Sequence, residues 1–597
     1  MAIQKYLENQ DAGLLRYARN DARCGLFRGS PIAGQHGITS METMIPADHT
    51  LRARRAINAA RAVAALYAGV GLVAMWLAPR VPYADAWRFL GHFLQAPFPR
   101  DIFTPDNGHH EVLPNAVRVV DLHVFAAQQW LQVAVGIVLA LSTVAVFWRG
   151  IAALTDARLR AAALLAVVLG LFWLGNIRVL AHGNESVHAY SVTLFLVLGM
   201  QVLASRREGK GGLRDAVVAA VCGVAAAFSF GSGIACFVAY AAVLTVGRAP
   251  WRQWMVLAVG LLSTLALMRW DGGDGIAIQF APLQQLELLL RWLAGPFVYA
   301  FWLFLDPALA DKIPLVAARA PVHAIAQAYE TTFGPVMLAR WPHVLFGLAG
   351  LIWFGATGWR AWRRRAFAAL HGIGLACFAA AVGMMIVLVR FDYFGQHPNQ
   401  LLAARYVVWS SLFWAGLSLA VIAQSRVPSR ALAMTLVVAV MLLPSQLWMA
   451  ELGARMRVVA EQTALAAAVG VIEPDLPLGE SVLGELAAAL PVVRAARVAV
   501  FAWSEAQWLG RAPVPGQLLP IDVQDVHVMV VANSIGVPGR RVRFTHGGVP
   551  NARVLLLDGD GIVRGIAMRD RGEQWIGWMQ GTEPAGTAPQ ITIPKHQ

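Results

Sequence analysis

Residues 80–127 read RVPYADAWRFLGHFLQAPFPRDIFTPDNGHHEVLPNAVRVVDLHVFAA and form a long polar segment, the first loop, in an otherwise apolar chain. Apolar stretches at about 57–79 and 128–148 flank it, each near the length that crosses a bilayer. The sequence therefore predicts a membrane scaffold that holds the first loop over a bilayer surface. The side chains that this loop gathers include Asp85, Trp87, His92, Asp101, Asp106, Asn107, His109, His110, Glu111 and Asp121.

The composition of the chain is that of a polytopic membrane protein. Of its 597 residues, 57% are hydrophobic and 14% are charged, and the mean hydropathy is +0.55. Such a chain is too apolar for a soluble globular protein. The net charge of +14 comes with Arg residues in short clusters between apolar stretches, which the positive-inside rule explains. We therefore expect membrane lipids as partners and no nucleic acid.

Apolar stretches that approach the ~20 residues of a membrane-crossing helix recur along the chain. Basic clusters fall in alternate connections between them, which predicts that those connections are cytoplasmic. The N-terminus is then cytoplasmic, whereas the first loop and the C-terminus lie outside, as in a multi-pass protein of a bacterial inner membrane. The expected eleven spans are residues 57–79, 128–148, 162–180, 186–204, 215–230, 233–247, 253–268, 343–358, 366–389, 405–424 and 430–449.

Residues 286–338 leave two topologies open. If the apolar stretches at 286–305 and 313–338 both cross, the chain has thirteen spans, and if both stay at the outer face, it has eleven. Glu287, Arg291 and the Gly295-Pro296 break make a lipid-facing crossing costly, because charge and broken helices survive in a membrane only against protein or water. This favours eleven.

The fold class that we expect is a polytopic α-helical membrane protein with a C-terminal extracytoplasmic α+β domain rich in β-strands. Period-two alternation of apolar residues after residue 511 predicts the strands, and the DGDG run at Asp558–Gly561 predicts a hairpin turn. The predicted regions are a cytoplasmic tail (1–56), a transmembrane domain (57–450), a helical connector (451–510) and a β-rich domain (511–597).

Asp85 lies just past the first span, in YADAWRFL. The neighbouring aromatic residues Tyr83, Trp87 and Phe89 are typical of the headgroup level of a membrane. A carboxylate in that place is suited to accept the proton of an attacking hydroxyl group. The alternative is a helix N-cap or a solvated loop acid.

A second polar cluster begins at Asp106 in PDNGHHEVLP. Asn107, His109, His110 and Glu111 favour a polar surface that hydrogen-bonds sugar hydroxyl groups, and the alternative is a capped turn at a helix start. The HHE sequence lacks the spacing of a zinc-binding HExxH motif, so no metal ligand is predicted. No cofactor is expected, and a divalent metal is left open but is not indicated.

This loop resembles the GT-C superfamily of integral-membrane glycosyltransferases. The likeness rests on the acidic residue after the first span, the long first outer loop, the many spans, the C-terminal domain, and the run DNGHHEVLPNAVRVVDLHVF, which is similar to an "NEHR…P" stretch of uncharacterised bacterial members. The likeness covers about residues 57–450. It implies transfer of a sugar from a polyprenyl-phosphate donor at the outer face, with Asp85 as base and Asp106 and Glu111 as further catalytic acids. His110 stands where the motif has Arg.

Other residues at the predicted outer face fit the same chemistry. Arg390 directly follows the predicted span 366–389, and Arg405 begins the span 405–424. Both are placed to meet a lipid phosphate at the interface, although both fit equally well as snorkelling anchors. The connection GNIRVLAHGNESVHAY (175–190) is unusually polar for a short turn, which indicates a cavity lining. Its candidate substrate-binding residues are Arg178, His182 and Glu185, with Asn176, Asn184 and His188 beside them.

The function that the sequence favours is transfer of a sugar to a lipid, glycan or protein acceptor of the cell envelope. A transporter or flippase of lipid-linked sugars would carry charges at mid-membrane, whereas here the charges gather at loop edges. An O-antigen polymerase or ligase would place its dominant outer loop late in the membrane region. A glycan-binding scaffold without activity is the third alternative.

Overall fold

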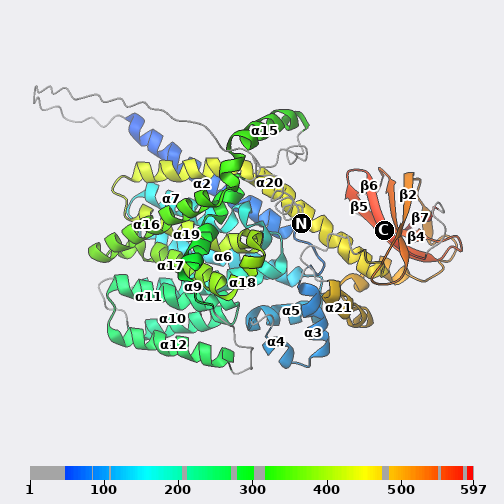
Figure 1. Cartoon of the computed structure of the whole chain (residues 1–597), viewed down its shortest axis with the longest axis horizontal. Coiled ribbons are helices and arrows are strands. Elements are labelled where there is room, and N and C mark those ends of the chain that lie inside the picture. The colour runs from blue at the N-terminus through cyan, green and yellow to red at the C-terminus, as the bar shows by residue number, and fades with distance from the viewer. Residues whose placement is uncertain are drawn as a thin grey trace, which may run out of the picture.

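A computed structural model of the chain describes the greater part of its 597 residues. It joins a bundle of apolar helices to an antiparallel sheet near the C-terminus, with the helices of the first loop between the two (Figure 1). The expected fold class, a polytopic helical membrane protein with a strand-rich C-terminal domain, is confirmed. The residues described are 47–83, 85–105, 109–204, 212–269, 279–301, 316–473, 483–548, 553–581 and 588–595.

Nine helices of the described residues are long and apolar enough to cross a membrane. Two further helices, α10 (Leu213–Ala227) and α11 (Cys236–Gly247), coincide with predicted spans but are shorter, so every predicted span corresponds to a helix. The helices that form the nine candidate spans are α2 (Ala47–Trp76), α6 (Trp130–Ala152), α7 (Ala157–Phe172) with its continuation to Leu180, α9 (Gly183–Ala204), α12 (Trp251–Arg269), α16 (Arg340–Arg364), α17 (Leu370–Val389), α19 (Ala404–Ala423) and α20 (Pro428–Val469).

Small residues bring the centre of the bundle into close contact. A Cβ atom at Gly372 of α17 would lie 2.3 Å from the backbone nitrogen of Ala420, and one at Gly416 of α19 would lie 2.5 Å from that of Ala376. The two helices therefore meet backbone to backbone, as membrane helices do when glycine or alanine lines the interface.

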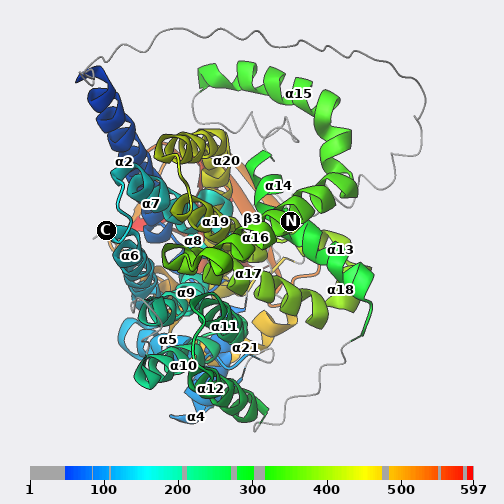
Figure 2. The same cartoon turned by 90° about the vertical axis from the view of Figure 1, so that its left-hand side faces the viewer.

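The described residues of the region 282–338 form the helices α13 (Pro282–Leu293), α14 (Gly295–Phe301) and α15 (Val316–Leu338). None of them is among the nine candidate spans of the described residues, and parts of both predicted stretches, 302–305 and 313–315, lie outside those residues. α13 packs against α16, because a Cβ atom at Gly347 would lie 2.0 Å from the carbonyl oxygen of Leu290. α15 curves around one side of the bundle (Figure 2).

The first loop folds into three short helices, α3 (Ala86–Gln95), α4 (Arg100–Phe103) and α5 (Val112–Phe125). They lie at the end of the bundle that faces the sheet, next to α21 (Leu483–Ala496) (Figure 1). α3 is strongly amphipathic and packs its apolar face on α21, where a Cβ atom at Gly91 would lie 3.1 Å from that of Ala489. One hydrophobic core thus includes residues of the first loop, α20, α21 and the sheet.

α20 is one continuous helix of 42 residues, although it contains Pro444. It runs from the membrane bundle to the sheet (Figure 1) and so passes residue 450, where we expected the transmembrane domain to end. Its last part is tied to the sheet, because Gln462 Nε2 donates to Asp570 Oδ1 over 2.8 Å. The last predicted span and the start of the helical connector therefore belong to one continuous helix.

Among the described residues, the sheet has seven antiparallel strands in the order β1-β7-β4-β5-β6-β3-β2. The DGDG run joins β4 to β5 as predicted, and Asp558 Oδ1 accepts hydrogen bonds from the Asp560 and Ile562 backbone nitrogens. Trp575 and Trp578 are buried in the sheet domain. The strands are β1 (Leu518–Pro520), β2 (Gln524–Val531), β3 (Gly539–Thr545), β4 (Val554–Leu557), β5 (Val563–Arg571), β6 (Gln574–Gln580) and β7 (Gln590–Pro594).

Candidate active site

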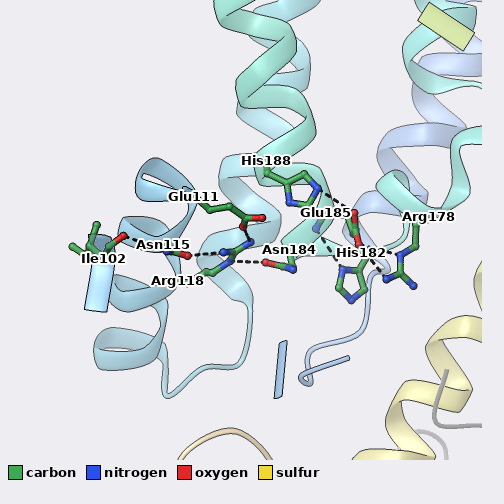
Figure 3. Close-up of polar contacts among 9 residues, drawn as sticks. All are labelled: Ile102, Glu111, Asn115, Arg118, Arg178, His182, Asn184, Glu185 and His188. Carbon is green, nitrogen blue, oxygen red and sulfur yellow. Dashed lines mark hydrogen bonds and ion pairs between the residues drawn. The ribbon is translucent and has the colours of Figure 1, made fainter. Parts of the chain in front are cut away.

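The connection between α7 and α9 forms a buried charged cluster. It folds as a 3-10 turn (Leu174–Asn176), the one-turn helix α8 (Ile177–Leu180) and the first turns of α9. Glu185 lies at its centre: Arg178 Nη2 contacts its Oε1 at 3.1 Å, and His188 Nε2 contacts its Oε2 at 3.1 Å (Figure 3). The spacing of these residues on the turns of α8 and α9 brings their charges together.

Tyr83 of the first loop packs directly on this cluster. Its ring lies 5.0 Å from the His182 ring, and the Arg178 guanidinium lies 5.2 Å from the Tyr83 ring centroid. A cation over an aromatic face is attracted to the electrons of the ring. The predicted substrate-binding residues Arg178, His182 and Glu185 therefore meet one another and also meet the first loop.

His182 is buried between two candidate spans. Burial, and then the positive charge of Arg178, lower the pKa of His182 from 6.5 to about 3, so the imidazole is neutral at pH 7. Its Nδ1 accepts from the Glu185 backbone nitrogen over 3.4 Å, which leaves the proton on Nε2. Among the described residues Nε2 has no hydrogen-bond partner, so it is a buried donor available to a bound molecule.

A second buried network holds Glu111 and Arg118. Arg118 Nη2 lies 2.6 Å from Glu111 Oε2, its Nη1 donates to Asn115 Oδ1 over 2.6 Å, and its Nε donates to Asn184 Oδ1 over 2.5 Å (Figure 3). Asn115 in turn donates to the Ile102 carbonyl. Since Asn184 precedes Glu185 in α9, the two networks lie side by side and join the first loop to the 176–188 segment.

The histidine pair of the first loop closes this region from the side of α10 and α12. His109 packs on Phe230 with ring centroids 4.5 Å apart, and His188 stacks on the same ring at 4.4 Å. His110 Nε2 lies 3.1 Å from the carbonyl oxygen of Met268 at the end of α12. The break between α10 and α11, which includes Phe230 and Gly231, thus takes part in the site.

Asp85 lies outside these two buried networks. It occupies the N-cap position of α3 without a side-chain cap bond, and its side chain is 45% exposed. Its Oδ1 lies 3.8 Å from Arg88 Nη1, which also contacts Glu485 of α21 at 2.7 Å. Asp106 and Asn107 of the second polar cluster lie outside the described residues.

Arg390 and Arg405 lie at the ends of α17 and α19. Arg390 is the C-cap of α17, with its guanidinium 5.9 Å from the Tyr393 ring. Arg405 begins α19, donates from Nη2 to Gln400 Oε1 over 3.3 Å and lies 5.2 Å from the Tyr406 ring. Both guanidinium groups thus sit against tyrosine rings at span ends.

Arg118 and Asn115 of the second network, and Asp121 near the start of α6, were not among the predicted site residues. Arg118 and Asn115 share one face of α5 with Glu111, at the i, i+4, i+7 spacing of a helix, and this polar stripe was legible in the sequence. Asp121 accepts from the Gln129 and Leu131 backbone nitrogens at the start of α6, and its burial raises its pKa despite these bonds. Among the described residues, no group of three or more His, Cys, Asp or Glu side chains is arranged to hold a metal ion.

Taken together, the site combines two buried arginines, each matched by a glutamate, with a neutral histidine donor and several amides. Such groups hold polar ligands in a fixed orientation with little reorganisation when the ligand binds. The site lies where the apolar helices end and where the first loop meets the sheet domain. A molecule with an apolar tail in the bilayer could therefore present a polar head to it.

Comparison with protein-family models returned no match, and comparison with curated proteins returned none either. Solved structures that the chain resembles include the archaeal oligosaccharyltransferase AglB from Archaeoglobus fulgidus with an inhibitory peptide and a dolichol-phosphate (12% identity, TM-score 0.39, 74% of this chain and 64% of that one). They also include apo ArnT from Cupriavidus metallidurans (13% identity, TM-score 0.33, 80% of this chain and 96% of that one).

The chain thus spans less than two thirds of the length of the archaeal structure.

Proposed function

We propose that the protein is a glycosyltransferase of a bacterial inner membrane that moves a sugar from a polyprenyl-phosphate donor to a cell-envelope acceptor. The reaction takes place at the periplasmic face, with the N-terminus in the cytoplasm and the C-terminal domain in the periplasm. The acceptor is a lipid, a glycan or a protein. A donor anchored in the membrane by its polyprenyl chain presents its sugar at the ends of the spans, which is where the polar residues gather.

The observation that carries this proposal is the contact between two distant polar segments. The first loop and the 176–188 segment meet through the Arg118–Asn184 hydrogen bond and through the Tyr83–His182 ring contact. Both segments were selected from the sequence as candidates for sugar chemistry. Buried charge is costly for a membrane protein, so a cluster of this kind indicates a functional site.

In the proposed reaction, Asp85 takes the proton from an acceptor hydroxyl group. The oxygen of that hydroxyl group attacks the anomeric carbon of the donor at the same time. The bond from that carbon to the phosphate oxygen breaks, and polyprenyl phosphate leaves with the bonding electron pair. The exposed carboxylate of Asp85 suits this role, since it can release the proton to water. Arg390 or Arg405 stabilises the departing phosphate, because guanidinium groups bind phosphate oxygens strongly.

Of the two roles that the sequence predicts for Glu111, a catalytic acid and a group that orients the sugar, we assign it the second, because its carboxylate is paired with Arg118. His109 contacts Phe230 and His110 contacts the Met268 carbonyl oxygen, so both lie against the helix bundle. His182 Nε2 offers a hydrogen bond to a sugar hydroxyl group or a phosphate oxygen.

The test compares membranes with wild-type protein and with Asp85→Asn, incubated with labelled polyprenyl-linked sugars and separated into lipid and glycan fractions. With wild-type protein, label should leave the carrier. With Asp85→Asn, the rate at which label leaves the carrier should be at least about a hundredfold lower. Asp525→Asn, at an exposed site of β2, is the matched control and should be as active as wild type. Full activity of Asp85→Asn would contradict the assignment of Asp85 as the base. Label that crosses the bilayer while still attached to its carrier would indicate a flippase.

A further inference from the structure

Arg88 of α3 lies between two carboxylates. Its Nη1 is 2.7 Å from Oε1 of Glu485, in the first turn of α21, and 3.8 Å from Oδ1 of Asp85, at the start of its own helix. The first distance is that of a charge-assisted hydrogen bond, whereas the second is too long for a hydrogen bond. The contact of Arg88 with α21 is therefore the stronger of these two.

The packing of α3 on α21 fixes this arrangement. The two helices lie side by side next to the sheet (Figure 1), and a Cβ atom at Gly91 would lie 3.1 Å from that of Ala489. Leu486, which follows Glu485, is buried in the core that the first loop shares with α20 and the sheet. The position of Glu485 is thus set by burial of apolar side chains and does not depend on the ion pair itself.

The three residues are connected through the first turn of α3. Asp85 and Arg88 are three positions apart, so their side chains are neighbours on one face of the helix. Without Glu485, the guanidinium would be able to close on Asp85, and its charge would no longer be matched by α21. Both changes favour the ionised form of the Asp85 carboxyl group and make it a weaker base.

The other charges around α3 are matched or lie further along the chain. Arg118 of α5 lies over the Phe89 ring, 4.2 Å from its centroid, and is paired with Glu111. The remaining charged or titratable side chains of α3, α4 and α21 are at least one helical turn from Arg88 or Glu485 along the chain; they are His92, Arg100, Asp101 and Arg494.

We propose that Glu485 is a positioning residue for the catalytic base. It holds Arg88 away from Asp85 and matches the charge of the guanidinium, so that the Asp85 carboxylate keeps the proton affinity that general-base catalysis needs. The proposal rests on the proposed function for the role of Asp85. It makes α21, more than 350 positions further along the chain, a part of the machinery that activates the acceptor.

The titration of Asp85 can be followed without any transfer reaction. Full-length protein in phosphatidylcholine nanodiscs is treated with a water-soluble carbodiimide and glycine ethyl ester at a series of pH values, and mass spectrometry quantifies the modified peptide that contains Asp85. The reagent modifies protonated carboxyl groups, so the initial rate falls as Asp85 ionises. With Glu485→Gln, the titration midpoint of Asp85 should lie at least about 0.5 pH unit lower than with wild type.

Transfer kinetics supply a second readout. The acid limb of the kcat profile should move to lower pH in Glu485→Gln, in the same direction as the titration. At pH 7.5 kcat should fall roughly threefold or more, because the base is weaker. The KM for the acceptor should stay within about twofold, because only the proton-transfer step is changed.

Two further variants separate this role from a general effect of charge or fold. Asp156→Asn is the matched control, because Asp156 is also partly exposed and paired with an arginine, Arg158 at 2.8 Å, but follows the far end of α6; it should titrate and transfer as wild type does. In an Arg88→Gln background, adding Glu485→Gln should shift the Asp85 midpoint less than about half as far as it does in wild type, because Glu485 acts through Arg88.

The proposal is overturned if the Asp85 midpoint is the same in Glu485→Gln and wild type, if Asp156→Asn shifts it equally, or if the shift is undiminished in the Arg88→Gln background. Failure of the proposed function is a separate result. A shifted midpoint together with full activity of Asp85→Asn would leave the hold of Glu485 on Arg88 standing and contradict the role of Asp85. Loss of transfer in Asp85→Asn with an unshifted midpoint in Glu485→Gln would leave the function standing and remove Glu485 from it.

Discussion

Glu111 and Arg118 form an ion pair of 2.6 Å in which the two side chains are only 4% and 5% exposed. Burial of two charges is costly, and their attraction offsets that cost only while both are present. Removal of either partner alone therefore leaves an unpaired buried charge in the first loop and destabilises it. Asn115 and Asn184 accept hydrogen bonds from the other two nitrogens of the guanidinium and fix its plane.

Glu111→Gln should destabilise the protein by about 3–5 kcal/mol, because it leaves the Arg118 charge buried without a counter-charge. Thermal unfolding of the solubilised protein measures the change. The control is Glu485→Gln, which breaks the more exposed pair with Arg88 and should cost no more than about 1 kcal/mol. Equal effects of the two substitutions would contradict the assignment of a buried pair.

His182 should make stability depend on pH. Its pKa in the folded protein is lowered to about 3, while the unfolded chain takes up a proton near 6.5. The contribution of the neutral histidine is thus fully present above pH 6.5 and is lost as the pH falls from 6.5 toward 3, at about 1.4 kcal/mol per pH unit.

Unfolding midpoints of wild type and His182→Gln, measured from pH 7 to pH 5, check this dependence. The variant should lose less stability than wild type over that range. His527→Gln, at an exposed position of β2, should keep the wild-type slope. A slope unchanged in His182→Gln would show that other groups cause the dependence.

Gly231→Ala should impair activity more than stability. The added Cβ would lie 2.5 Å from His109 Nδ1, and the histidine ring can move aside without any shift of the backbone. That movement disturbs the stack of His109 on Phe230, so we expect transfer to fall by roughly tenfold or more. Gly247→Ala, which has no atom within 4 Å of its new Cβ, should keep full activity.

Gly416→Ala should lower the stability of the helix bundle by disturbing the contact between α19 and α17. Its Cβ would lie 2.5 Å from the backbone nitrogen of Ala376, and backbone cannot move aside as a side chain can. We expect a loss of about 1–3 kcal/mol in unfolding measurements. Gly355→Ala in α16 meets nothing within 4 Å and should be neutral or slightly stabilising, so a comparable loss there would refute the packing argument.

The fold was largely legible in the sequence because its signals are local. Spans of apolar residues predict helices directly, and the alternation around Asp558–Gly561 predicts a hairpin with its turn. The strands β1 and β7 were not predicted, since the three and five residues that they contain are too few for a pattern. The continuity of α20 was also missed, because the change in composition near residue 450 reflects a change of surroundings and not of secondary structure.

The candidate site was predicted in part. Arg178, His182, Glu185 and Glu111 were selected because polar residues are rare in such a chain, and they do lie in neighbouring buried networks. Their partners could not be assigned, since the pairing of Arg118 with Asn184 depends on how α5 packs against α9. A single sequence contains no direct signal for contacts of this range.

The core that the first loop shares with the C-terminal region has a consequence for the order of synthesis. Trp87 and Leu90 are made early, whereas Leu486 and Val493, which belong to the same core, are made about four hundred residues later. During translation α3 therefore lacks these packing partners until α20, α21 and the sheet have been made. The first loop can complete its packing only after the C-terminal domain has been synthesised. The protein therefore cannot complete its polar site before that domain has been made.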